Sequence, residues 1–220
     1  MKSIDQHYSD AIAESYDRDR VDSDRWRLER DIIVPLLRVI PEGSTVLDIA
    51  AGTGRWLPIY AEQRLRPILL DSSEDMLAHA RTKAANLRLP VTIIVESALA
   101  NAAFPTSDYA ITTNFLNWIP LHSLAAVMMK IRDARIPRAI FMTTYLPADL
   151  PPRRANAARA AIRDKNRAVL EGRRDRGIYH LHEEAELRAI LHDTGWSISS
   201  EHQISQKGGR RNVMFVASIA

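Results

Sequence analysis

The segment from Val46 to Trp56 reads VLDIAAGTGRW, and its residue types and spacing can hold a ligand. An apolar run carries Asp48 near its end, and a loop of small residues with Gly52 and Gly54 then leads into a predicted helix. Small residues let the backbone turn sharply and approach a ligand closely, and the start of a helix offers N–H donors. The segment therefore predicts a ligand-binding loop.

Two common phosphate-binding fingerprints do not fit this loop. The dinucleotide pattern GxGxxG needs a third glycine three residues after Gly54, where this chain has Leu57. The GK[ST] triplet that cradles triphosphates is also missing from the loop. Both phosphate-binding interpretations are therefore disfavoured.

Polar residues also follow the next predicted strands. Asp71 ends the second strand, Glu96 and Ser97 follow the third, and Asn114 follows the fourth. In an open sheet of parallel strands, an acid at the end of the second strand is the expected partner of ribose hydroxyls. Asp71 is therefore the first candidate for binding a ribose.

The elements that must position these residues alternate between strands and helices. Short apolar runs predict strands at 45–49, 67–70, 91–95, 109–113 and 139–144. Helical patterns begin at Ser73 and cover 121–134. This alternation predicts an α/β fold with a mostly parallel, doubly wound sheet.

The two ends of the chain follow other patterns. Residues 4–40 predict two helices, the second capped near Asp22-Ser23-Asp24. The C-terminal end predicts a helix over 183–192 and two strands, 196–204 and 212–219, which a turn at Gly208-Gly209 joins into an antiparallel hairpin.

The loop after the first strand resembles motif I of the class I S-adenosylmethionine-dependent methyltransferases, D-x-G-x-G-x-G. Asp48, Gly52 and Gly54 match it, and Ala50 replaces its first glycine. Further segments resemble the family in order along the chain, and residues 147–177 resemble it least. These segments are 70–77, 96–98, 108–118 and 182–196, together with Tyr8 and the AESYD stretch at 13–17, which resembles the N-terminal lid helix of the small-molecule branch.

The resemblance implies a Rossmann-like sheet of seven strands, the last one antiparallel, in a single domain over 1–220. An N-terminal helical lid would cover 1–40, and an Arg-rich helical insert at 147–177 could cap the substrate. The implied cofactor is S-adenosyl-L-methionine, with S-adenosyl-L-homocysteine as product and no metal. Carried over from the family, the cofactor-binding residues are Tyr16, Asp48, Ala50, Gly52, Gly54, Asp71, Ser72, Met76, Glu96, Ser97 and Asn114.

The implied reaction transfers a methyl group to O, N or S of a small molecule. A general base is needed only if the acceptor is protonated at the working pH. His180, His182, His122 and Tyr145 are candidates, of which His180 is assigned the catalytic role and His182 the cap of the following helix. The candidate substrate-binding residues are Tyr8, Trp26, Trp118, Tyr145 and Arg154; packing or surface roles remain open for all of these residues.

Residues 151–176 are strongly basic, with eight Arg and one Lys against three acids, whereas the whole chain has a net charge of only +3. Three interpretations stay open: a solvated helix, a lid that aims arginines at a substrate carboxylate, and an RNA-binding face. The lid interpretation suggests an anionic or amino-acid-like acceptor. Because no aromatic residues alternate with the arginines, RNA is disfavoured.

Other observations restrict the function further. The sequence has no cysteine and no apolar run of about 18 residues, and its first residues lack the pattern of a signal peptide, so we expect a soluble cytoplasmic protein. The segment NFLN at 114–117 lacks the Asn-Pro-Pro-Tyr pattern of adenine and glutamine methyltransferases. Two alternatives remain: an RNA-modifying methyltransferase, and a non-catalytic protein that binds S-adenosylmethionine.

Overall fold

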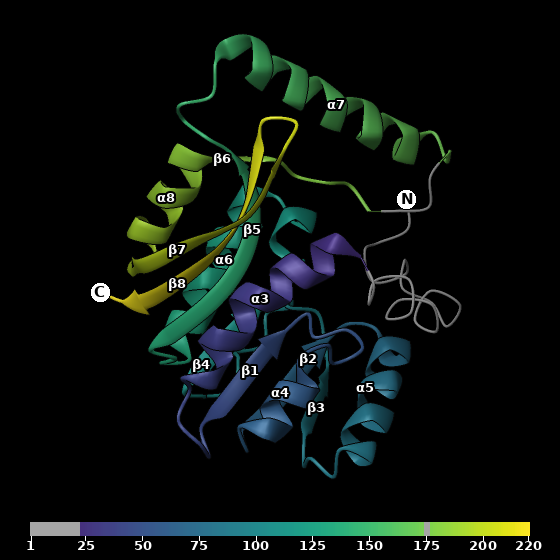
Figure 1. Ribbon diagram of the computed structural model, residues 1–220, viewed down its shortest axis with the longest axis vertical. Helices are drawn as coiled ribbons and strands as arrows, with labels where there is room; N and C mark the ends of the chain where they lie inside the picture. The colour runs from purple at the N-terminus through teal and green to yellow at the C-terminus, as the bar shows by residue number, and fades with distance from the viewer. Residues whose placement is uncertain (1–22, 174–176) are drawn as a thin grey trace.

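A computed structural model describes residues 23–173 and 177–220, and its backbone is drawn in Figure 1. The predicted first helix, with Tyr8 and Tyr16, lies outside the described residues. The described strands are β1 (Thr45–Ile49), β2 (Arg66–Asp71), β3 (Thr92–Val95), β4 (Tyr109–Thr112), β5 (Arg138–Leu146), β6 (His182–Glu183), β7 (Trp196–Lys207) and β8 (Arg210–Ile219). The helices are α3 (Asp24–Arg38), α4 (Leu57–Glu62), α5 (Glu74–Asn86), the 3-10 turn η2 (Leu116–Trp118), α6 (Leu121–Asp133), α7 (Pro152–Leu170) and α8 (Glu184–Asp193).

The strands form one sheet in the order β3-β2-β1-β4-β5-β8-β7. Strands β1 to β5 pair in parallel, β8 is antiparallel to β5, and β7 is antiparallel to β8. The strand order reverses between β1 and β4, and ligands of such sheets bind at the carboxyl ends of the strands at this reversal. The predicted doubly wound sheet with an antiparallel last strand is confirmed.

The sheet also contains one strand more than the seven expected. Strand β6 pairs in parallel with the end of β5, through Tyr145↔His182 and Leu146↔Glu183. A two-residue strand shows no periodicity that a sequence pattern could reveal.

Helices cover both faces of the sheet because its strands carry apolar side chains on both sides (Figure 1). On one face, Leu47, Phe141 and Phe215 pack in a fully buried cluster with α6 and α8. On the other face, Val46 and Ile111 pack with α3, α4 and α5. Successive strand residues therefore enter different cores, which explains why the strands read as continuous apolar runs.

Helix α3 starts as the sequence predicts, because the Ser23 hydroxyl accepts a hydrogen bond from the Trp26 amide at 3.2 Å. The predicted cap of α8 is wrong. Glu183 occupies the N-cap position, while His182 is buried and its Nε2 lies 3.1 Å from the Leu116 carbonyl oxygen. The ring of His182 therefore joins α8 to η2 instead of closing the helix end.

Helix α7 forms most of the Arg-rich insert and runs beyond the end of β5, near the turn of the β7–β8 hairpin (Figure 1). Ala155, Ala158, Ile162 and Ala168 are its buried residues, and all five of its arginines are exposed. Within residues 23–173 and 177–220, no helix has the length and apolar character needed to span a bilayer.

Candidate functional site

The loop after β1 and the end of β2 are joined by backbone hydrogen bonds. The Gly52 amide donates to Asp71 Oδ2 at 2.8 Å, and the Ser73 amide donates to Asp71 Oδ1 at 2.9 Å. Gly52 has a φ of +56°, and a Cβ atom there would lie 3.1 Å from Met76 Cε. The carboxylate of Asp71 is thus fixed in orientation beside a loop that fits closely only without a side chain.

These residues line a pocket at the reversal of strand order, which we call the β1–β4 pocket. It has about 660 Å³ of empty space including its open mouth. Its lining residues are Ala50, Gly52, Leu70, Asp71, Ser72, Met76, Ser97, Ala98, Leu99, Thr113, Asn114, Phe115 and Trp118. Seven of the eleven candidate cofactor residues therefore lie around one cavity.

Three other candidate cofactor residues, Asp48, Gly54 and Glu96, do not line the β1–β4 pocket. Asp48 is buried and accepts a hydrogen bond of 3.0 Å from the Tyr60 hydroxyl, and burial raises the pKa of its carboxyl to about 7. Glu96 supports the site through its backbone, because its amide donates to the Asp71 carbonyl at 2.9 Å.

A second cavity, the α3 pocket, lies next to the first and shares Asn114 and Trp118 with it. It has about 830 Å³ of empty space including its mouth. Its lining residues are Ser23, Arg25, Trp26, Glu29, Arg55, Asn114, Asn117, Trp118, Met142, Thr143, Thr144, Lys165, Tyr179 and Asn212. The two pockets therefore adjoin at Asn114 and Trp118.

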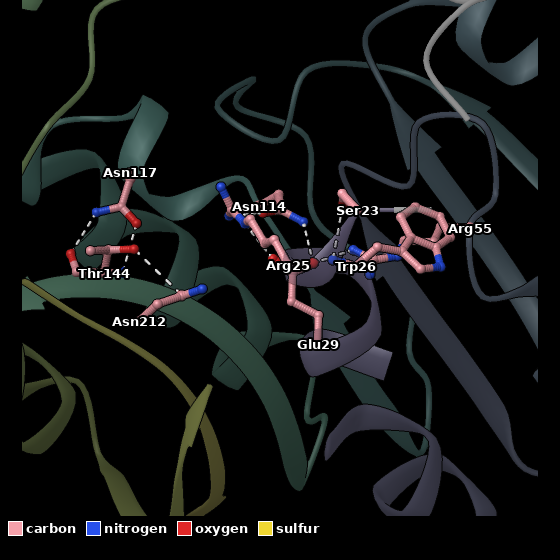
Figure 2. A network of polar contacts seen from close by, with 9 residues as sticks. All are labelled: Ser23, Arg25, Trp26, Glu29, Arg55, Asn114, Asn117, Thr144 and Asn212. Atoms are coloured by element: carbon pink, nitrogen blue, oxygen red, sulfur yellow. Dashed lines mark hydrogen bonds and ion pairs between the residues drawn. The ribbon is translucent and has the colours of Figure 1, made fainter. Parts of the chain in front are cut away.

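Glu29 is the centre of a polar network between the two pockets (Figure 2). Its buried carboxylate accepts hydrogen bonds from Arg25 Nε at 2.6 Å, Arg55 Nη1 at 2.5 Å and Asn114 Nδ2 at 3.4 Å. Burial raises the pKa of Glu29, but the two guanidinium groups outweigh burial and hold it below its usual value. Glu29 is therefore ionised at neutral pH and holds Asn114 and both arginines in place.

Arg55 is also enclosed by aromatic rings. Its guanidinium carbon lies 3.7 Å from the ring centroid of Trp26 and 4.1 Å from that of Trp56. The two tryptophans are stacked with centroids 6.3 Å apart. This stack ties the loop after β1 to the first turns of α3 and fixes one wall of the α3 pocket.

The opposite wall is held by Asn117 (Figure 2). Its Oδ1 accepts from the Thr144 amide at 2.7 Å, and its Nδ2 donates to the carbonyl oxygens of Thr144 at 2.8 Å and His180 at 2.9 Å. The neighbouring residues, Trp118 and Tyr179, then meet edge to face with centroids 5.5 Å apart. Asn117 thus positions the aromatic wall that faces both cavities.

The candidate substrate-binding and catalytic residues lie in different parts of the structure. Trp26 and Trp118 line the α3 pocket, whereas Arg154 is exposed on α7. Tyr145 lies in the hydrophobic core, and its hydroxyl donates to Glu201 at 2.5 Å. His180 lines a third cavity beneath α7, where burial and neighbouring histidines lower its pKa.

Several residues of the α3 pocket were not among the candidates from the sequence. These are Ser23, Arg25, Glu29, Arg55, Asn117, Met142, Thr143, Thr144, Lys165, Tyr179 and Asn212. One signal could have indicated Glu29, because it lies four residues before Ile33 and eight before Leu37 on the buried face of α3.

Within the described parts of the chain, no group of three or more acidic, His or Cys side chains is arranged to hold a metal ion.

Comparisons with known proteins agree with this arrangement. Residues 46–137 match the family model described as a methyltransferase domain. No curated protein sequence matches the chain. Residues 46–137 thus match a methyltransferase domain, and the chain has the fold of S-adenosylmethionine-dependent methyltransferases, in agreement with the resemblance drawn from its motifs.

Solved structures share the fold over almost the whole chain. Magnesium protoporphyrin IX methyltransferase from Synechocystis PCC 6803 with bound S-adenosylmethionine is 20% identical, with a TM-score of 0.61 over 94% of this chain and 97% of that one. An S-adenosylmethionine-dependent methyltransferase from Clostridium acetobutylicum ATCC 824 is 13% identical, with a TM-score of 0.67 over 96% and 98%. Geranyl diphosphate C-methyltransferase from Streptomyces coelicolor A3(2) is 12% identical, with a TM-score of 0.64 over 94% and 84%.

Proposed function

We propose that the enzyme methylates a small anionic molecule, with S-adenosylmethionine in the β1–β4 pocket and the acceptor in the α3 pocket. The observation that carries this proposal is that Asn114 and Trp118 line both cavities. A methyl donor and an acceptor in these cavities would meet at those two side chains.

The residues of the β1–β4 pocket suit the cofactor. Asp71 is oriented by two amides at the end of β2, where an acid is the expected partner of the two ribose hydroxyls. Met76 and Ser97 provide an apolar and a polar wall for the adenine, and the Gly52 backbone allows close approach of the ligand. When bound, the cofactor supplies an activated methyl group on a sulfonium centre.

The chain's own contribution to the transfer is positioning. Holding two reactants in line can supply roughly 7–11 kcal/mol of the barrier reduction. The wall built by Asn117 and the stack around Arg55 fix the shape of the α3 pocket before the acceptor arrives. His180 lies outside this pocket, so an acceptor that must lose a proton would need a base other than its imidazole.

An anionic acceptor fits the charges of the α3 pocket. Arg25, Arg55 and Lys165 line it, and Glu29 is the single acidic side chain among its lining residues. Trp26 and Trp118 add flat apolar surface for the body of the molecule. Geranyl diphosphate, the ligand of one structural neighbour, is a small molecule with such an anionic group.

The experiment uses methyl-labelled S-adenosylmethionine with the full chain and a panel of small phenols, amines, thiols and carboxylic acids. We expect the wild type to transfer the methyl label to at least one anionic acceptor. The variant Asp71→Ala should lose this transfer. Labelling of RNA in place of every small molecule would contradict the proposed acceptor class. Cofactor binding without transfer to any acceptor would favour a non-catalytic protein.

A further inference from the structure

A third cavity, the α7 groove, lies between α7 and residues 179–182. It has about 1120 Å³ of empty space including its wide mouth. Its lining residues are Leu121, Arg159, Ile162, Arg163, Asn166, Arg167, Leu170, Tyr179, His180, Leu181, His182 and Glu186. All of its lining residues except Leu121 lie beyond the residues 46–137 that the family model matches, and the β1–β4 pocket contains no residue of α7.

One wall of the α7 groove is a row of guanidinium groups. Arg159, Arg163 and Arg167 are spaced by four residues and therefore lie on one side of α7. Arg159 pairs with Glu183 at 2.9 Å, whereas Arg163 and Arg167 have no ion-pair partner within residues 23–173 and 177–220. Glu186 is the acidic residue that lines the groove, so the arginines remain in excess.

The rest of the lining is apolar or neutral. Of the apolar lining residues, Ile162 is buried and Leu170 leaves 64% of its surface exposed. Leu121 and Leu181 complete an apolar strip beside the arginines. A row of cations next to an apolar strip suits a small amphiphile with an anionic end.

The α7 groove adjoins the α3 pocket through Tyr179, which lines both. Asn166 fixes this junction, because its Oδ1 accepts from the Tyr179 amide at 2.9 Å and its Nδ2 donates to the Tyr179 carbonyl at 2.8 Å. On the α3-pocket side, Lys165 Nζ lies 4.5 Å from the centroid of the Tyr179 ring. Helix α7 thus supplies a cation to the α3 pocket and three arginines to the α7 groove beside it.

We propose that the α7 groove binds a phosphate-type oxyanion at the far end of the acceptor, whose reactive end lies in the α3 pocket. This inference rests on the proposed function and narrows the acceptor to an elongated molecule with a phosphate or diphosphate end. Guanidinium groups bind such oxyanions through paired, charge-assisted hydrogen bonds. RNA fits the groove less well, since the apolar strip and Glu186 interrupt its positive surface.

The probe is inorganic pyrophosphate, titrated by calorimetry into the full chain at low ionic strength. The test variant is Arg163→Gln/Arg167→Gln, and the charge-matched control is Arg30→Gln/Arg153→Gln, whose two arginines are exposed outside all three cavities. We expect pyrophosphate to bind the wild type, with affinity about tenfold or more lower in the test variant and within about twofold of wild type in the control.

Three results would overturn the proposal. The first is that the wild type does not bind pyrophosphate, and the second is that both variants lose the same affinity for it. The third is that the wild type binds a single-stranded RNA tightly, the test variant does not, and pyrophosphate fails to displace the RNA. Titration of S-adenosylmethionine in parallel separates this inference from the proposed function. If the test variant binds the cofactor as wild type does but loses pyrophosphate, the groove has the assigned role. If the wild type binds pyrophosphate but not the cofactor, the proposed function fails and the anion site stands.

Discussion

The backbone amide of Gly52, in the loop after β1, donates a 2.8 Å hydrogen bond to the carboxylate of Asp71 at the end of β2. This contact joins the glycine loop after β1 and the acid at the end of β2, the two features of the sequence that most strongly predict ligand binding. It fixes the carboxylate and the loop relative to each other, and both line the β1–β4 pocket. A mutation that breaks this contact should therefore lower both the stability of the loop and the affinity for the cofactor.

Gly54→Ala should destabilise the protein. Gly54 has a φ of +67°, and an added Cβ would overlap Leu57 Cδ1 and lie 3.1 Å from the Ala80 Cβ. Backbone strain and overpacking together should lower the free energy of unfolding by roughly 2–4 kcal/mol. Urea unfolding measures this, with Gly43→Ala as control, because Gly43 has a φ of +78° and a Cβ added there would meet no atom within 4 Å. Equal losses in both variants would show that crowding at Gly54 is unimportant.

Glu29→Ala should cost roughly 3–5 kcal/mol, because it removes a buried carboxylate that pairs with the guanidinium of Arg55, which is only 9% exposed. Glu62→Ala, which breaks an exposed pair with Arg38, should cost less than about 1 kcal/mol. Chemical denaturation of both variants gives the comparison. A Glu29 variant no less stable than the Glu62 variant would contradict the role assigned to the network.

Asn117→Ala should raise the KM of the acceptor about tenfold or more while leaving the dissociation constant of S-adenosylmethionine within about threefold. The amide holds Trp118 and Tyr179 through the backbones of Thr144 and His180. Asn86→Ala, at an exposed position of α5, is the matched control. If kcat falls with an unchanged KM, Asn117 acts on the reaction itself and not on the shape of the acceptor pocket.

Asp48→Asn should remove a pH dependence of stability. Burial raises the pKa of Asp48 from 3.8 to about 7, so the folded state binds one proton more than the unfolded state between about pH 4 and pH 7. The contribution of Asp48 is therefore fully present below about pH 4 and is lost as the pH rises to 7, by up to about 1.4 kcal/mol per pH unit. The neutral amide introduced by the substitution would keep an acceptor for the Tyr60 hydroxyl without this loss.

Thermal unfolding of Asp48→Asn at pH 5 and pH 8 tests this expectation. The variant should gain stability relative to wild type on going from pH 5 to pH 8, whereas Asp31→Asn, an exposed substitution, should follow wild type at both values. A stability difference between Asp48→Asn and wild type that does not change with pH would contradict the raised pKa.

The sheet and the β1–β4 pocket could be predicted from the sequence because their signals are local. Each strand is a contiguous apolar run, and Ala50, Gly52, Asp71 and Asn114 occupy strand ends that the parallel topology brings to one edge. The α3 pocket could not be predicted in the same way. Its walls depend on contacts between distant segments, such as Arg25 with Asn114 and Asn117 with His180, for which no spacing rule exists.

Which single side chains face the pockets was also hard to predict, because side-chain direction too depends on contacts between distant segments. Asp48 matches the family motif, yet its carboxyl contacts Tyr60 of α4, because the position before the loop faces a helix and not the pocket. Tyr145 is the next-to-last residue of β5, and its ring stacks on Phe215 of β8 in the core. Register and side-chain direction, which one sequence does not specify, decided both cases.

The central claim is that Asp71 holds the ribose of S-adenosylmethionine in the β1–β4 pocket. Calorimetric titration of the cofactor into wild type, Asp71→Ala and the exposed control Asp31→Ala tests it most directly. We predict that Asp71→Ala loses about 1–3 kcal/mol of binding free energy, or roughly 5- to 150-fold in affinity, while Asp31→Ala binds as wild type does. Equal affinity of Asp71→Ala and wild type would contradict the account.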